Sequence, residues 1–253
     1  MRFVLHIASV LSTALILGCT QKIFIPVSQV RFDTPEANGH RNTAVAINLR
    51  PSHKAIYLTD DYKTIPVNTL NPVIADTYEQ RVVFFETVPI AVDYGFLDDL
   101  DIGILLSTFP QVYIKYQLTG VSQASAKKGN ISSAIKLRVL QQSSVYNDNG
   151  VRQLSVTDLG QDISVSAGYR LTDDVMIYTS LFTQTHKYLG YVNVGSFPGP
   201  FNGHFTQNGI SAAVHYDITK RSAFDLELVN TTIAAGISSN NSTVYNLRVV
   251  VRY

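Results

Sequence analysis

Side chains that could act as acids, bases or nucleophiles are spread along this chain of 253 residues. The candidates for such chemistry are three histidines, one serine and two aspartates: His53, His186, His204, Ser180, Asp60 and Asp61. No spacing among them matches an acid–base or nucleophile motif, although His186 and His204 flank one long loop and could approach each other on adjacent strands. No His, Cys and Asp residues group closely enough to favour a metal site. We therefore expect no metal, no cofactor and no enzymatic activity.

Other charged side chains recur at alternate positions of apolar segments. They comprise seven bases and six acids: Arg50, Lys115, Lys136, Arg138, Arg170, Arg248 and Arg252, with Asp93, Asp101, Asp162, Asp217, Asp225 and Glu227. Isolated charges in an enclosed interior are costly, so this near balance predicts that they pair across neighbouring strands. The predicted interior network consists of Asp225, Glu227, Arg248, Arg252, Lys136, Arg138, Arg170 and Asp162. Its most direct pairs join Asp225 and Glu227 to Arg248 and Arg252.

Strict alternation identifies the strands that position these charges. In the closing stretch "TVYNLRVVVRY", Tyr245, Leu247, Val249 and Val251 share one face, while Asn246, Arg248 and Arg252 share the other. The same alternation recurs in about ten segments, near residues 43–50, 88–96, 101–106, 111–119, 133–141, 162–171, 175–188, 205–217, 223–229 and 243–253. Each approaches the roughly 9–11 residues of a tilted strand that crosses a membrane.

Connections between these segments alternate in length. "GFLDDLD", "YRLTDDV" and "YDITKRSA" are tight polar turns, and Tyr94, Phe96, Tyr169 and Tyr216 lie beside them. The other connections include residues 59–79, "NDNGVRQLSVTDLG" and "YVNVGSFPGPFNG". Short turns on one side, long loops on the other and aromatic girdles are typical of closed antiparallel transmembrane β-barrels. A soluble β-sandwich or lipocalin-like barrel also alternates, but it places its charges outside. We expect ten strands, with eight as the alternative.

Composition excludes other classes. The chain is 45% hydrophobic and 15% charged, with a formal net charge of +1. The charged fraction lies below the roughly 25% of soluble domains, and a nucleic-acid surface would need a clustered basic excess. No stretch approaches the 18 or so apolar residues of a membrane-spanning helix.

The N-terminus reads as a secretory signal. "MRFVLHIASVLSTALILGCT" has a basic start and a short apolar core that ends in "ILGC". This box resembles the bacterial lipoprotein signal, in which the cysteine is acylated and becomes the first mature residue. Cys19 is the only cysteine, so it has no disulfide partner within the chain. The alternative is an ordinary signal peptide that is cleaved near Gly18.

The chain resembles bacterial outer-membrane β-barrel proteins, through the "ILGC" box and the closing "VVVRY" with its terminal aromatic residue. The resemblance implies an outer-membrane location, contact with outer-membrane lipid, and recognition of the last strand by the barrel-assembly machinery. It divides the chain into a signal peptide (1–18), an acylated N-terminus with a periplasmic linker (19–42) and the barrel (43–253).

A barrel of about ten strands has little room beyond its own side chains. The function expected is therefore a structural or surface-interaction role with a filled, salt-bridged lumen. A narrow pore for small solutes is the alternative, and an outer-membrane hydrolase comes third.

Topology adds one expectation about the N-terminus. An even number of strands places both ends of the barrel in the periplasm, so that residues 20–42 would only bridge locally. Pro51 predicts a bulge or a strand end, because proline removes a ladder donor. A separate hairpin at this point would make the strand count odd and leave the anchor outside.

Overall fold

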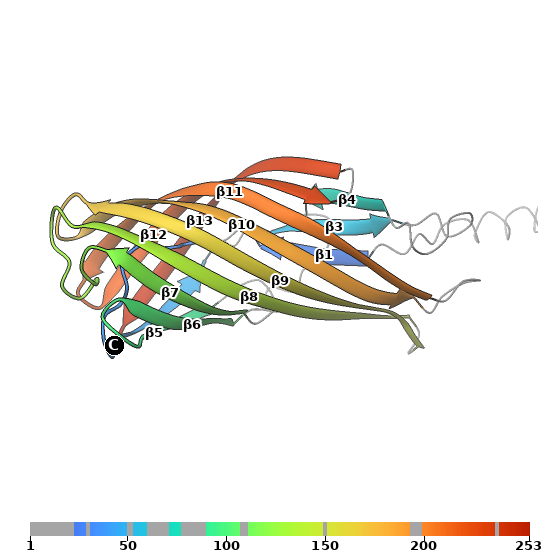
Figure 1. The fold of residues 1–253 in the computed structure, drawn as a ribbon, viewed down its shortest axis with the longest axis horizontal. Helices are drawn as coiled ribbons and strands as arrows, with labels where there is room; N and C mark the ends of the chain where they lie inside the picture. Colours follow the sequence, from blue (N-terminus) through green and yellow to red (C-terminus); the bar gives the residue numbers. More distant parts are fainter. Residues whose placement is uncertain are drawn as a thin grey trace, which may run out of the picture.

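Alternating apolar and polar residues build ten antiparallel strands that close into one barrel (Figure 1). This computed structural model describes residues 23–28, 31–49, 53–59, 71–76, 90–106, 111–148, 151–192, 199–235 and 238–253. The barrel strands are β2 (Thr43–Asn48), β5 (Ile90–Gly95), β6 (Leu100–Leu106), β7 (Gln111–Thr119), β8 (Ile131–Asp148), β9 (Val151–Arg170), β10 (Val175–Val192), β11 (Gly199–Thr219), β12 (Ser222–Ala235) and β13 (Ser238–Arg252). Each pairs with its neighbours in sequence order, and β13 pairs with β2 to close the ring.

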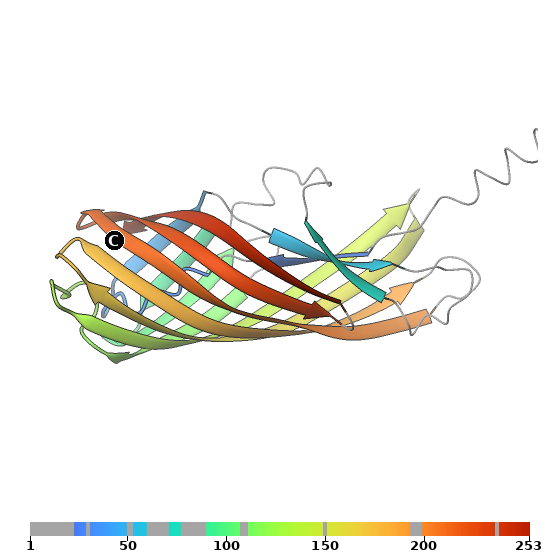
Figure 2. The same cartoon turned by 90° about the horizontal axis from the view of Figure 1, so that it is seen from above.

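The predicted ten-stranded antiparallel barrel is therefore confirmed, and every predicted segment forms a strand. Strand lengths differ from the expectation. Strands β8 to β11 have 18 to 21 residues, whereas β2, β5 and β6 have six or seven. The wall is consequently tall on one side and short on the other, as Figure 2 shows.

Apolar side chains cover the outside of this barrel. In β7, Val112, Ile114 and Leu118 are each about half exposed, while Lys115 and Gln117 are buried inside. The alternation of the last strand is also as predicted, with Arg248 buried and Tyr245 exposed. A soluble fold would invert this pattern, because its apolar face would form the core.

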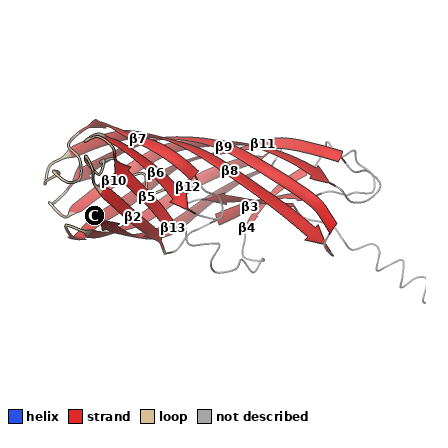
Figure 3. Ribbon diagram, turned by 90° about the horizontal axis from the view of Figure 1, so that it is seen from below, coloured by secondary structure: helices blue, strands red, loops and turns tan. Residues whose placement is uncertain are grey.

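One end of the barrel carries the short turns and the C-terminus (Figure 3). We call it the turn end. Tyr94, Phe96, Tyr169 and Tyr216 are exposed there, as the sequence predicts for an interfacial girdle. The connection 120–130 between β7 and β8 lies at the same end and is longer than the other turns.

Three further strands form a separate small sheet that the sequence did not predict. They are β1 (Ile23–Ser28), β3 (His53–Thr59) and β4 (Asn71–Asp76), in the order β1-β3-β4. Strand β2 ends at Asn48, and β3 begins at His53 outside the barrel ring. Pro51, at which the sequence predicts a bulge or a strand end, lies outside the described residues. Because β3 pairs outside the ring, the barrel keeps an even number of strands.

Residues 31–38 occupy the lumen, and we call them the lumen segment. The sequence placed these residues in a linker (19–42), but Arg31, Asp33 and Glu36 are buried among the inward side chains of the wall. A linker in water would leave such charges exposed. Their ion pairs with the wall explain why the segment enters the barrel instead.

Close approach makes glycine necessary where the lumen segment leaves the barrel. A Cβ on Gly95 would lie 1.9 Å from the carbonyl oxygen of Gly39. The same backbones are joined by a hydrogen bond from the Arg41 N–H to the Gly95 carbonyl, at 2.8 Å. Gly39 itself has a φ of +89°, which glycine adopts without strain.

Candidate functional site in the barrel lumen

The centre of the lumen is a buried cluster around Asp33. Its carboxylate lies 3.2 Å from the Lys136 ammonium and 3.3 Å from the Arg138 guanidinium, both on β8. Arg31 lies 3.1 Å away, and the Ser180 hydroxyl on β10 donates to the same carboxylate at 3.3 Å. These neighbouring cations compensate the charge of the buried carboxylate. The lumen segment thus supplies an anion to a basic patch of the wall.

Arg31 joins the lumen segment to an acidic residue of the wall. Its guanidinium forms an ion pair with Asp162 on β9, with the Nη2–Oδ1 bond at 2.8 Å. The same group lies 4.0 Å above the ring of Phe182 on β10. The fork of arginine suits such a two-point contact with a carboxylate.

Glu36 provides the third anchor, at the turn end. Its carboxylate accepts hydrogen bonds from the Arg170 guanidinium, the shortest at 2.7 Å, and from the Asn130 amide at 2.8 Å. Arg170 also pairs with Asp217 at 3.1 Å. The Asn38 N–H donates to the Asp101 carboxylate at 3.1 Å, just above the first short turn.

Glu227 holds the backbone of the lumen segment. It accepts hydrogen bonds from the backbone N–H groups of Arg31 and Phe32, at 3.1 and 2.6 Å, and from the Asn246 amide at 3.1 Å. Phe32 has a φ of +43°, which turns both N–H groups toward one acceptor. Two successive N–H groups that converge in this way form an anion-binding nest.

Removal of the Glu227 carboxylate should loosen this contact. We expect Glu227→Ala to lower the free energy of unfolding by about 1–3 kcal/mol, since buried N–H groups lose their acceptor. Glu227→Gln keeps an acceptor oxygen and should lose less. Urea unfolding followed by circular dichroism measures both variants, and equal losses would contradict the assigned role.

The ion pairs that the sequence predicts between β12 and β13 form only in part. Arg248 contacts Asp225 with Nε and Oδ2 2.8 Å apart, as the sequence suggests. Glu227 faces Asn246 in the register, so its predicted arginine partner is replaced by the lumen segment. Arg252 pairs instead with Asp217, at 2.7 Å.

His215 completes the network near the turn end. Its Nδ1 lies 2.7 Å from Asp225 and its Nε2 lies 3.0 Å from Asp217. The amide of Gln123, from the connection 120–130, approaches the same Nε2 at 2.9 Å. The Gln123 N–H donates to the Ala37 carbonyl at 2.8 Å, so this connection also caps the lumen segment.

The histidines expected as catalytic candidates are not brought together. His186 is buried, with its Nδ1 2.6 Å from Asp158 and its ring stacked on Phe205. His204 pairs with Lys187, the residue that follows His186 on β10. Successive residues of a strand point to opposite faces, so His204 is exposed on the outer face of the wall while His186 points inward. His53 begins β3 in the small sheet, and Asp60 and Asp61 lie outside the described residues. Ser180 contacts Asp33 and lies in the central cluster.

Among the described residues, no three His, Cys, Asp or Glu side chains are grouped to hold a metal ion. In the same part of the chain, no helix is long and apolar enough to cross a membrane. Cys19, the expected lipidation site, precedes the first described residue.

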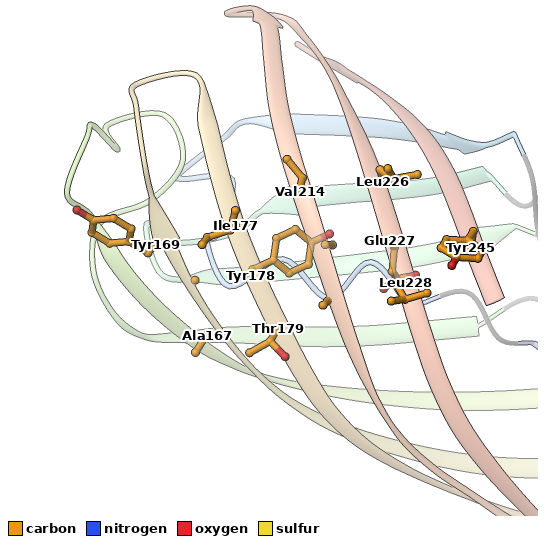
Figure 4. Close-up of a pocket in the computed structure, with 13 residues that line it drawn as sticks. Ala167, Tyr169, Ile177, Tyr178, Thr179, Val214, Leu226, Glu227, Leu228 and Tyr245 are labelled. Atoms are coloured by element: carbon orange, nitrogen blue, oxygen red, sulfur yellow. The ribbon is translucent and has the colours of Figure 1, made fainter. Parts of the chain in front are cut away.

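A hollow of about 640 Å³ lies on the wall formed by β9 to β13 (Figure 4). Most of its lining comes from outward positions such as Ile177, Val214, Leu226 and Tyr245. Small residues on the same face, including Ala167 and Ala212, leave the space between them. The hollow belongs to the apolar outer surface and lacks the convergent polar groups of a typical ligand site.

Sequence reasoning missed the lumen segment. The available signal was "RFDTPE", in which Arg31, Asp33 and Glu36 stand within a stretch that also carries Phe32 and Pro35. Neither alternation nor helical periodicity marks such a segment, because it is extended chain that pairs through side chains.

Comparison with known proteins gives fold neighbours. The barrel is similar to solved outer-membrane barrels. Ail of Yersinia pestis, the attachment invasion locus protein, aligns at 8% identity over 85% of this chain and 99% of its own, with a TM-score of 0.33. The N-terminal β-barrel domain of Pseudomonas aeruginosa OprF aligns at 11% identity over 85% and 99% of the two chains, with a TM-score of 0.25. A loop-deletion mutant of OmpT, an outer membrane protein of Vibrio cholerae, aligns at 9% identity over 92% and 99%, also at 0.25. No family model and no curated protein matches the chain.

Proposed function

We propose that this chain is an outer-membrane β-barrel with a structural or surface-interaction role, whose lumen is closed by its own residues 31–38. The observation that carries the proposal is the Asp33 carboxylate, held by Lys136 and Arg138 at the centre of the lumen. A solute path would have to displace a segment with ion pairs to β8 and β9 and a buried hydrogen bond to β12.

Lumen closure can be tested by conductance. The purified full chain in planar bilayers should give no stable open-channel currents, because the lumen segment and the connection 120–130 fill the path. A chain that inserts and shows large, long-lived openings would contradict the proposal and favour the narrow pore. An empty bilayer and a known porin set the two reference levels.

The apolar exterior supports a membrane location. Large apolar side chains recur at outward positions around the ring, and the aromatic residues of the turn end border them. Tilted strands need about ten residues for an apolar band about 25 Å tall. Counted from the turn end, this places Leu181 of β10 near the middle of the band, while Leu189 lies beyond it.

A charge at the middle of the band should impair insertion. We expect Leu181→Arg to lower stability by about 2–4 kcal/mol, whereas Leu189→Arg should cost about 0–1 kcal/mol. Both leucines are more than half exposed, at 62% and 57%, so neither change disturbs the lumen. Heat-modifiable gel mobility after assembly into lipid compares the two variants. Equal tolerance would argue against a lipid-facing wall.

The lipoprotein assignment rests on "ILGC" and is part of the proposal. Cys19→Ser should abolish incorporation of labelled palmitate, while the barrel still assembles through its C-terminal strand. Equal labelling of variant and wild type would contradict acylation at Cys19. Heat-modifiable mobility of the same samples shows whether assembly is intact.

A further inference from the structure

The lumen segment runs inside the barrel away from the turn end, as far as the level of Lys136 and Arg138 on β8 and Asp162 on β9. At the turn end, the Thr43 N–H donates to the carbonyl of the C-terminal Tyr253, and Asn38 contacts Asp101. Glu36 contacts Arg170, directly before a short turn, whereas Arg31 contacts Asp162, eight residues further along β9. Contacts of the lumen segment therefore move away from the turn end as the chain is followed toward its N-terminus.

Strand β1 continues in the same direction. Ser28 pairs with His53, which follows the far end of β2, and Ile23 pairs with Leu58 still further along β3. In Figures 1 and 2 the small sheet lies away from the turn end, beside the far part of the tall wall. Strand β4 contacts β12 and β13, which fixes the sheet to the barrel.

From this path we propose that the barrel displays its own N-terminal part at the cell surface, with residues 31–38 as the portion that crosses the membrane inside the lumen. The inference rests on the proposed outer-membrane function, and it takes the turn end to face the periplasm, because the short turns of outer-membrane barrels lie on that side. It replaces the periplasmic N-terminus expected from the sequence. An acyl group on Cys19 would then join the outer leaflet.

The charges of the wall fit a resident chain better than a passing one. Asp33 forms ion pairs with both Lys136 and Arg138, and Glu36 is held by Arg170. These contacts come from β8 and β9, and Glu227 on β12 adds the backbone contact. Because the anchors lie on separate parts of the ring, the barrel must close around the segment for all of them to form. Display would therefore be fixed during assembly of the barrel.

Accessibility of single cysteines in intact cells tests the topology. The variants are Lys22→Cys next to β1, Ser196→Cys in the connection between β10 and β11, and Lys220→Cys in a short turn. A membrane-impermeant maleimide is applied before and after permeabilisation, with the wild-type chain as the blank for Cys19. We expect full labelling of Lys22→Cys and Ser196→Cys in intact cells, and labelling of Lys220→Cys only after permeabilisation.

The two proposals fail in different ways. If Ser196→Cys is labelled in intact cells but Lys22→Cys is protected, surface display is overturned while the outer-membrane barrel stands. If Lys220→Cys is labelled and Ser196→Cys is protected, the orientation in the proposed function is wrong.

A crosslink tests the route. Asp33→Cys combined with Ser180→Cys should form a disulfide under mild oxidation, because the parent side chains are 3.3 Å apart. The pair Asp33→Cys with Lys220→Cys serves as the unlinked control. A labelled Lys22→Cys without the 33–180 crosslink would overturn passage through the lumen.

Discussion

Deletion of residues 31–38 is expected to turn a closed barrel into a conducting one. The segment contributes Arg31, Asp33 and Glu36 to the lumen, and its removal leaves the cations of β8 and β9 to be hydrated. The segment carries two acids and one base, so its loss makes the lumen more positive and favours anions. Single-channel recording in planar bilayers should show stable openings with anion selectivity, where the full chain shows none.

Deletion of an equal length elsewhere separates plug removal from general damage. Residues 61–68 lie outside the described part of the chain, and their deletion should leave the barrel closed. Both variants must show heat-modifiable mobility before recording. A correctly assembled deletion of 31–38 that does not conduct would mean that the wall side chains close the lumen without the segment.

Replacement of Arg170 by methionine should cause the largest loss of stability among single changes in the lumen. Its buried guanidinium contacts Glu36 at 2.7 Å, Asp217 at 3.1 Å and the Asp173 carbonyl at 2.7 Å. Removal of one partner from a buried ion pair leaves an uncompensated charge and costs about 3–5 kcal/mol. Urea unfolding followed by circular dichroism measures the difference.

A double variant identifies the charge as the cause. Arg170→Met combined with Glu36→Gln should recover part of the loss, because Asp217 keeps its contact with Arg252. Coupled residues of this kind show interaction energies of about 0.5–3 kcal/mol. Lys128→Met at an exposed lysine should stay within about 0.5 kcal/mol of wild type. Purely additive losses at 36 and 170 would argue against the pair.

The barrel itself follows from the sequence. A period of two is local information, and outward residues such as Ile114 and Leu228 alternate with inward ones such as Lys115 and Glu227 whatever their distant partners are. The pairing of Asp225 with Arg248 could also be predicted from the sequence. Strands β12 and β13 form a hairpin, and the short connection between them nearly fixes their register.

What fills the lumen was decided by tertiary structure alone. Asp33 meets Lys136 and Arg138 across more than a hundred positions of sequence, and Glu36 meets Arg170 across 134. Glu227 likewise accepts hydrogen bonds from residues 31 and 32 as well as from Asn246 of the adjacent strand, where the sequence had predicted an arginine partner. The alternation of apolar and polar residues predicts whether a side chain points inward or outward. The ion pair that an inward side chain forms depends on which other segment of the chain lies in the lumen. The extended segment 31–38 has no period of its own, so only closure of the ring around it determined its place.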